Sequence, residues 1–308
     1  MRVDPYGNQT SGGRRGFGGM RWWILLLFGL YAAWSWFGSA KTDPYTGETA
    51  HYGTSADEEV QLGEQAFAQV LNDAGSQRAL LASSAPQSQA VSRIAQRLID
   101  KVPQVTDALA RQNNQEAPTD YRSFKWSVAV IDSQEANAFC LPGGKMAVYT
   151  GLFPVTQNDD ALAVVMGHEI AHALLRHGSQ RMAQQKLVQL GQVAAGAAVG
   201  GMDPQQQQMI MGALGAGAQY GLVLPYGRNH ETQADKVGLM LAAAACYDPR
   251  QAIPLWQRMS QLGGGQRPAE FASTHPDPAN RIATLQQLMP KALEFYQANC
   301  ANKPLAAR

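Results

Sequence analysis

The sequence contains little that would suit a nucleic-acid-binding protein or a thiolate metal site. Its 25 lysines and arginines nearly balance 24 acidic residues, and no block of basic residues is present. Electrostatic binding to nucleic acid is therefore not expected, and no nucleotide-binding motif occurs. The 3 cysteines include no C-x-x-C pair, which argues against zinc held by thiolates. Length and composition fit one globular domain with a modest appendage.

Long apolar runs are also scarce, and the one plausible membrane span lies near the N-terminus. Residues 22–37 are uncharged and rich in tryptophan, and the run is close to the minimum span of about 17 residues. Arginines precede it, which predicts a cytoplasmic N-terminus. We expect a disordered tail over residues 1–20 and a transmembrane anchor over residues 21–40. A cleaved signal peptide is the alternative, because Gly38-Ser39-Ala40 suits signal peptidase.

With either N-terminus, the rest of the chain is expected outside the cytoplasm. Residues 41–56 have the composition of a turn-rich linker, residues 57–300 are the predicted folded domain, and residues 301–308 are a tail. An oxidising compartment would allow Cys246 and Cys300 to form a disulfide, leaving Cys140 buried and reduced. The sequence does not establish this pairing.

The clearest chemical signal is His168-Glu169-Ile170-Ala171-His172, within an apolar helical pattern. Residues four apart share one face of a helix, so His168 and His172 can hold the same zinc ion. Glu169 is then placed beside a metal-bound water that it would deprotonate. Zinc lowers the pKa of such a water to about 7. The pattern predicts one Zn²⁺ per chain and hydrolysis without a covalent intermediate.

A third ligand has to come from elsewhere in the chain. An extended motif would need histidine at position 178, where the chain has Gly178, and His177 is off register. We expect His177 to be a polar residue in the last turn of the zinc helix. About sixty residues on, Glu231 and Asp235 lie four apart in a second helical pattern. Glu231 can complete the ligand set, and Asp235 can hydrogen-bond a ligand histidine. For this pair alone, a solvated acidic face is the alternative.

Four blocks of the sequence together resemble the M48 family of zinc metallopeptidases, in its single-anchor envelope type. They are residues 137–152, 168–172, 228–235, and Thr274-His275-Pro276 with Arg281, and the similarity covers roughly residues 57–295. The resemblance implies that His168, His172 and Glu231 are zinc ligands and that Glu169 is the catalytic base. It also implies a zincin-like α+β fold, mainly helical, with a small antiparallel sheet beside the zinc helix.

Hydrophobic periodicity agrees with this fold. Helices are expected over residues 58–71 and 86–102, and alternating patterns over residues 124–131 and 145–150 are expected to form antiparallel strands. Asn137, Ala138 and Phe139 lie between these strands. They are candidates for a sheet edge to which an extended substrate adds, with an ordinary structural hairpin as the alternative. Residues 187–224 are expected to form a helical hairpin.

His275 is the remaining candidate site residue. It lies in a loop just before a predicted helix start at Asp277 and Pro278. Its imidazole could stabilise the oxyanion formed during hydrolysis, occupy the open zinc position in a resting enzyme, or simply fix the loop.

The sequence therefore predicts a zinc endopeptidase anchored in a bacterial inner membrane, with its catalytic domain in the periplasm, or a periplasmic enzyme after signal cleavage. The resemblance implies unfolded, misfolded or damaged envelope proteins as substrates, and envelope assembly or quality-control factors as partners. One alternative is a latent protease that acts mainly as a chaperone-like binding factor. Another is a prenyl-protein peptidase embedded in the bilayer, which a single plausible span disfavours.

Overall fold

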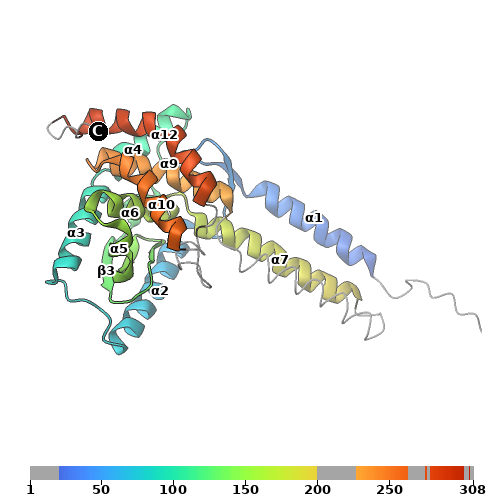
Figure 1. The fold of residues 1–308 in the computed structure, drawn as a ribbon. Coiled ribbons are helices and arrows are strands. Elements are labelled where there is room, and N and C mark those ends of the chain that lie inside the picture. The colour runs from blue at the N-terminus through green and yellow to red at the C-terminus, as the bar shows by residue number, and fades with distance from the viewer. Residues whose placement is uncertain (1–20, 200–226, 263–274, 276–277, 302–304, 306–308) are drawn as a thin grey trace, which may run out of the picture. The chain divides into compact units, whose positions relative to one another are not determined.

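The computed structural model describes residues 21–199, 227–262 and 278–301, and the single residues 275 and 305 (Figure 1). The chain divides into two compact units, Met1–Gly38 with Gln185–Leu222, and Ser39–Gln184 with Val223–Arg308. Every candidate site residue belongs to the second unit.

The second unit is mainly helical, as predicted from the sequence. Its helices are α2 (Ala56–Ser76), α3 (Pro86–Ile99), α4 (Val102–Gln112), α5 (Phe153–Thr156), α6 (Asp159–Leu174), α9 (Arg228–Ala244), α10 (Ala252–Leu262) and α12 (Pro278–Asn299). Helix α7 (His177–Val199) begins in this unit and ends in the other. The strands are β1 (Ala40–Thr42), β2 (Thr49–His51), β3 (Ser127–Ile131), β4 (Ala138–Leu141) and β5 (Lys145–Tyr149).

The larger sheet has the strand order β3-β5-β4. Strand β4 pairs antiparallel with β5, but β3 pairs parallel with β5. The prediction that the segments 124–131 and 145–150 are antiparallel to each other is therefore wrong. The chain passes through β4 first, and a turn at Gly143 and Gly144, both with φ +78°, folds β5 back between β4 and β3. Alternation reveals a strand but not its neighbour.

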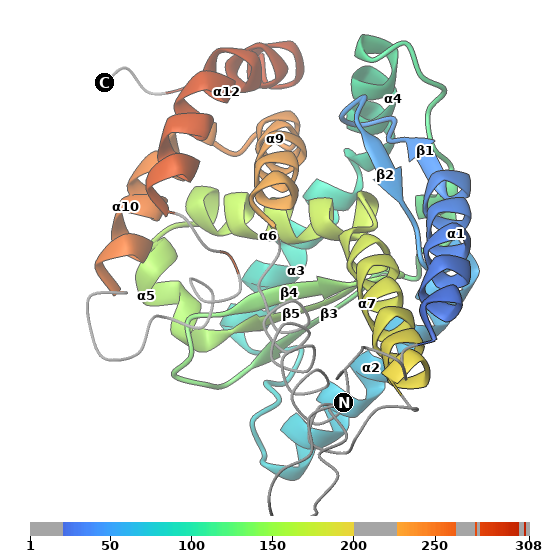
Figure 2. The ribbon, with the colours of Figure 1, turned by 90° about the vertical axis from the view of Figure 1, so that its right-hand side faces the viewer.

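Helix α6 lies between this sheet and α9 (Figure 2). Its first turn is capped by Asn158, whose Oδ1 accepts a hydrogen bond from the Ala161 backbone N–H at 2.8 Å. Every residue from Ala161 to Leu174 is buried. A helix that is apolar all round belongs in a core, so the histidines on α6 are held inside the protein rather than at its surface.

The stretch expected to be a linker contains a folded hairpin, β1–β2. The Asp43 carboxylate accepts hydrogen bonds from the backbone N–H groups of Tyr45 (3.0 Å) and Thr46 (2.9 Å). Gly47 takes the left-handed conformation with φ +78°, which glycine adopts at little cost. Tyr45 is buried. The hairpin is thus part of the second unit.

A disulfide joins Cys246, just after α9, to Cys300, just after α12. The pairing that the sequence left open is therefore present, and Cys140 is the free, buried thiol. This crosslink holds together the C-terminal ends of the two helices that carry Glu231, Asp235 and Arg281.

The first unit contains helix α1 (Trp22–Gly38), which has 17 residues, none of them buried. Most of its large apolar side chains are exposed, with Trp34 at 74% and Phe37 at 76%. Among the described residues, no helix combines the length and apolar character needed to cross a membrane. Of the helical hairpin predicted over residues 187–224, α7 accounts for the part up to Val199; the remainder lies outside the described residues.

Candidate metal centre

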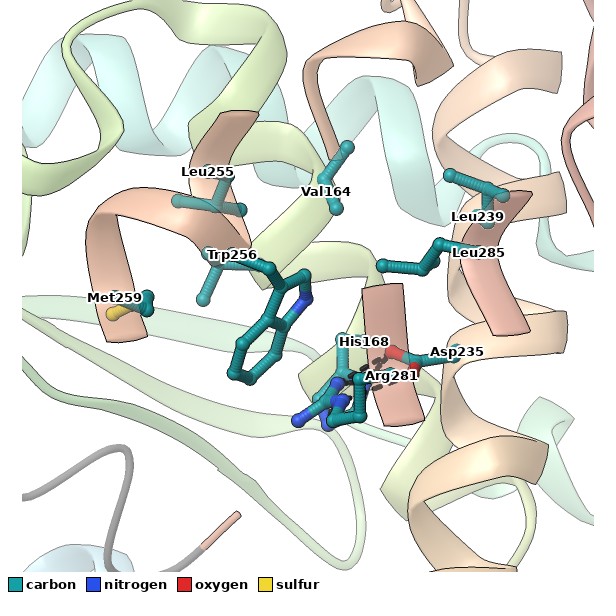
Figure 3. Close-up of a pocket in the computed structure, with 10 residues that line it drawn as sticks. Val164, His168, Asp235, Leu239, Leu255, Trp256, Met259, Arg281 and Leu285 are labelled. Carbon is teal, nitrogen blue, oxygen red and sulfur yellow. Dashed lines mark hydrogen bonds and ion pairs between the residues drawn. The ribbon is translucent and has the colours of Figure 1, made fainter. Parts of the chain in front are cut away.

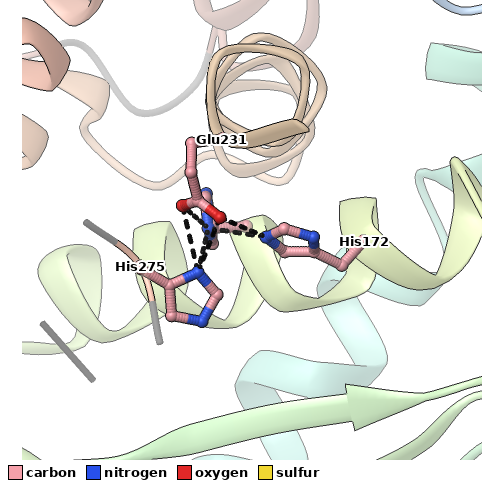
Figure 4. Close-up of side chains that lie close together, drawn as sticks. His172, Glu231 and His275 are labelled. Carbon is pink, nitrogen blue, oxygen red and sulfur yellow. Dashed lines mark hydrogen bonds and ion pairs between the residues drawn. The ribbon is translucent and has the colours of Figure 1, made fainter. Parts of the chain in front are cut away.

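Four side chains from three parts of the second unit meet at one point. His168 and His172 come from α6, Glu231 comes from α9, and His275 lies three residues before α12. Figure 4 shows His172, Glu231 and His275 turned toward one another. One ligand atom from each of the four residues lies within 4.8 Å of the other three, and all four side chains are buried.

The spacing of these atoms fits a tetrahedral zinc site. The Nε2 atoms of His168 and His172 are 3.0 Å apart. The Glu231 carboxylate oxygens lie 3.4 Å from His168 Nε2 and 3.6 Å from His172 Nε2. Ligand atoms at about 2.0 Å from zinc in a tetrahedron are roughly 3.3 Å apart. Imidazole nitrogens and a carboxylate oxygen are also donors that zinc prefers, so the residues present fit this ion.

A close crossing of two helices brings the ligands together. At Gly167 and Gly238 the backbones of α6 and α9 touch: a Cβ built on Gly238 would lie 2.6 Å from the backbone nitrogen of His168. Larger residues would hold the helices apart. The crossing places Glu231 and Asp235, which lie toward the N-terminal end of α9, against the histidines of α6.

Asp235 and Arg281 surround His168 and Glu231. His168 Nδ1 lies 3.1 Å from Asp235 Oδ1. Arg281 donates through Nε to Asp235 Oδ2 and through Nη1 to Glu231 Oε2, both at 2.9 Å, and its guanidinium lies 3.6 Å from the centre of the Trp256 ring. The arginine compensates two buried carboxylates. Arg281 belongs to one of the four sequence blocks that resemble the family, but its contacts with the acidic residues were not predicted from the sequence.

Burial and hydrogen bonding shift the pKa values of these groups in different directions. Burial alone would raise the pKa of Glu231, but hydrogen bonds from His168 and His275 outweigh it and hold that pKa below the usual range. For His172, burial holds the pKa well below its ordinary value, so the ring is neutral and its lone pair is available to a metal.

Glu169 lies beside the cluster and is also buried. Among the described residues, its Oε1 has no hydrogen-bond partner; the Nε2 atom of His275 is 3.5 Å away, too far for a good hydrogen bond. Burial raises the pKa of this carboxyl, which makes it a stronger base when ionised. A buried carboxylate oxygen that accepts no hydrogen bond from the described residues, with raised basicity and next to a metal cluster, is suited to take a proton from water.

The three candidate substrate-binding residues lie at the edge of the sheet. Strand β4 pairs with β5 on one side only, among the strands that the structure describes. Tyr149 N–H donates to Asn137 O at 3.0 Å, so by the alternation of an antiparallel ladder the backbone groups of Ala138 and Cys140 face the other side. The Phe139 side chain packs with Tyr149 in a separate cluster, and by the same alternation the backbone groups of Asn137 and Phe139 face β5.

A small cavity lies behind His168, where α6, α9, α10 and α12 meet (Figure 3). Its volume is about 10 Å³, room for no more than roughly one water. It is lined mostly by apolar side chains, including Leu239 and Leu255, together with Asp235 and Arg281. This cavity is too small to hold a substrate side chain.

His177 is not in the last turn of the zinc helix, so that prediction is wrong. Helix α6 ends at Leu174, and Arg176 adopts φ +54°, which redirects the chain. His177 opens α7, is fully buried, and places its Nδ1 atom 2.9 Å from His172 Nδ1. No glycine or proline marks this break, because Arg176 supplies the left-handed residue. The sequence analysis did not place His177 in the site. The sequence signal that could have done so is its position five residues after His172.

Two histidines one helical turn apart, a carboxylate from a second helix and a buried glutamate define a zincin-like metal centre. The model of peptidase family M48 matches residues 97–289, and the chain belongs to this family. The predicted family is thereby confirmed, and the histidine and glutamate cluster could hold the predicted zinc ion.

Several characterised proteins are similar in sequence. The mitochondrial metalloendopeptidase OMA1 of Schizosaccharomyces pombe is 33% identical over 239 residues, and the mitochondrial metalloendopeptidase OMA1 of Danio rerio is 30% identical over 317 residues. The beta-barrel assembly-enhancing protease of Escherichia coli is 34% identical over 160 residues. These matches cover 77%, 92% and 50% of this chain, but only 63%, 63% and 32% of the respective relatives.

Proposed function

We propose that the protein is a membrane-attached zinc endopeptidase that cuts unfolded or damaged proteins of the cell envelope. The observation that carries the proposal is the buried cluster of His168, His172 and Glu231 with Glu169 beside it. The names of the relatives, mitochondrial metalloendopeptidases and a beta-barrel assembly-enhancing protease, support protein substrates. The second name also supports partners in protein assembly.

Zinc, when bound, would polarise a peptide carbonyl and acidify a water molecule. His168 and His172 would hold it through Nε2 and Glu231 through its carboxylate, while Asp235 fixes the ring of His168 at 3.1 Å. Glu169 would accept the proton of the attacking water and pass it to the leaving amine. Arg281 pairs with both Glu231 and Asp235, and its charge lowers the pKa of the buried Asp235 carboxyl.

An extended peptide would bind along β4. The backbone groups of Ala138 and Cys140 are turned away from β5, so they would offer hydrogen bonds to an added strand. Because β4 packs against the zinc helix, that strand would run past the metal. The Asn137 side chain now accepts a hydrogen bond from the Ala138 N–H at 2.9 Å, and it would have to move for a substrate to pair there.

A latent protease is the second candidate, and the position of His275 favours it. Its Nδ1 atom lies 3.0 Å from Glu231 Oε2 and 3.3 Å from His168 Nε2, where it would act as a fourth ligand. A catalytic zinc site keeps one position open for water. With His275 bound, the protein would be at rest and could act as a chaperone-like binding factor. Withdrawal of His275 would open the site and free its imidazole to stabilise the oxyanion.

Helix α1 would attach the protein to the membrane. Its exposed tryptophans, leucines and phenylalanine suit a lipid interface. A periplasmic location for the catalytic unit is part of the proposal, motivated by the arginines before this helix, and release into the periplasm after cleavage near Ala40 is the alternative. Flotation of the full chain with liposomes tests attachment; a Leu26→Asp, Leu30→Asp variant should stay behind, and equal flotation of both proteins would count against α1.

Cleavage of an unfolded protein such as casein tests the activity. The full chain should degrade it, a chelator should stop the reaction, and added zinc should restore it. If wild type binds zinc without cleaving casein, while His275→Ala cleaves it, the latent form is the better description. Zinc-loaded wild type and His275→Ala that both leave casein intact would exclude the endopeptidase proposal.

A further inference from the structure

A chain of buried polar groups runs from zinc-site residue His172 to the β1–β2 hairpin. His172 Nδ1 contacts His177 Nδ1 at 2.9 Å, and His177 Nε2 contacts Gln233 Oε1 at 2.9 Å. Gln233 Nε2 in turn contacts Glu48 Oε2 at 2.7 Å. His172, His177 and Gln233 are buried, and Glu48 is exposed and directly precedes β2. Three separate segments of the chain thus meet behind one candidate metal ligand.

The chemistry of these groups fixes the direction of every hydrogen bond. An ionised carboxylate can only accept, so Gln233 must turn its amide nitrogen toward Glu48 and its carbonyl oxygen toward His177. That oxygen also only accepts, so His177 must carry its proton on Nε2. His177 is fully buried against His172, the Gln233 amide and the ring of His230. A charged imidazolium would be costly in this setting, so the ring is neutral and Nδ1 is left as an acceptor. The proton between the two rings therefore belongs to His172 Nδ1.

This direction leaves the lone pair of His172 on Nε2, the atom that faces His168 and Glu231. We infer that Glu48, Gln233 and His177 are positioning residues that fix the tautomer and orientation of His172 for zinc. The inference rests on the proposed role of His172 as a ligand. It also reveals an asymmetry, because His168 is backed directly by the Asp235 carboxylate, whereas the carboxylate behind His172 acts through two neutral groups.

Neighbouring contacts hold this chain in place. Asn229 donates a second hydrogen bond to Glu48 Oε2 at 2.7 Å, and the backbone of Glu48 accepts from Asp43 N–H at 2.7 Å. His230 stacks on His177 with ring centres 4.3 Å apart and planes 22° apart. The β1–β2 hairpin thus contributes to the metal site, because it carries Glu48, the last acceptor of the hydrogen-bond chain. The stacking with His230 fixes the plane of the His177 ring.

Zinc affinity, measured by competition with a chromophoric chelator, tests the inference. His177→Phe keeps a ring but removes both nitrogens, and zinc binding should weaken by roughly 10 to 100-fold. Gln233→Glu retains an acceptor toward His177 and should bind zinc at least as well as Gln233→Met, which has neither donor nor acceptor. Gln233→Lys can only donate, so it should reverse the chain and bind zinc least well. Thr232→Lys adds the same charge at the neighbouring exposed position and should change affinity little.

Nitrogen-15 NMR of histidine-labelled, zinc-free protein provides the second readout. His177 should show the Nε2–H tautomer and His172 the Nδ1–H tautomer, and Gln233→Lys should change both. Zinc affinity within about twofold of wild type for both His177→Phe and Gln233→Lys, or an Nδ1–H tautomer at His177, would overturn the inference. His172→Ala distinguishes a failure of the proposed function from a failure of this inference. If His172→Ala binds zinc like wild type, the assignment of His172 as a ligand is wrong. If His172→Ala loses zinc while His177→Phe and Gln233→Lys keep it, only the positioning role is wrong.

Discussion

Gly167 and Gly238 face each other where α6 crosses α9, and a Cβ on Gly167 would lie 2.8 Å from the carbonyl oxygen of Gly238. Gly167 directly precedes His168, and Gly238 lies one turn after Asp235. The absence of two side chains therefore determines how far the acidic residues of one helix stand from the histidines of the other. The metal site depends on backbone contact as much as on its ligands.

Substitution of Gly238 by alanine should damage both stability and metal binding. The added Cβ would meet the His168 backbone nitrogen at 2.6 Å, and relief of such overpacking typically costs about 1–3 kcal/mol. Thermal unfolding should occur at lower temperature, and zinc affinity should fall because α9 is displaced. Gly75→Ala in α2 is the matched control, since its Cβ would meet nothing within 4 Å. If both variants kept wild-type stability and zinc affinity, the crossing would not be the constraint described.

Removal of the Arg281 charge should destabilise the zinc-free protein more than the zinc-loaded protein. Arg281→Met leaves Glu231 and Asp235 buried without their cation, and breaking a buried pair costs about 3–5 kcal/mol. Bound zinc would supply positive charge to Glu231 and recover part of this loss. Chemical unfolding with and without zinc measures the difference. An equal loss in both states would argue against charge compensation by Arg281.

The Cys140 thiol should react slowly at pH 8 in the folded protein. Burial, with a smaller contribution from the Glu169 charge, raises its pKa far above the ordinary value, and only the thiolate is nucleophilic. Because a raised pKa leaves less thiolate at any pH below it, alkylation by iodoacetamide should stay slow until the solution is strongly alkaline. Unfolding in urea without reductant should release one reactive thiol, since Cys246 and Cys300 are joined. Equal rates in folded and unfolded protein would contradict the burial of Cys140.

Spacing along two helices indicated the central candidate residues, and the family resemblance supported their roles. His168, His172, Glu231 and Asp235 follow from four-residue repeats within two apolar patterns, and the structure brings all four together. Such repeats describe one element at a time. They could not show that α6 and α9 touch at Gly167 and Gly238, because that contact depends on the packing of distant segments.

Contacts between elements explain what the sequence did not predict. The parallel pairing of β3 with β5 arises because β5 lies between β3 and β4. The alternating pattern of apolar residues is the same whether two strands pair parallel or antiparallel. His177 was assigned to the zinc helix because the break at Arg176 uses a left-handed arginine, which no sequence pattern marks. The β1–β2 hairpin resembled a linker because its turn residues, Asp43 to Gly47, are those of any loop.

The most direct test of the account compares wild type with Glu169→Gln, measuring zinc content and casein cleavage on the same samples. Glutamine keeps the shape of the side chain but cannot accept the proton of water, and Glu169 is not among the four clustered ligands. We expect one zinc per chain in both proteins and cleavage of casein by wild type, or by His275→Ala if wild type is latent. Addition of Glu169→Gln should lower the cleavage rate by at least about 100-fold. A zinc-loaded Glu169→Gln protein that cleaves casein as fast as its parent would contradict it.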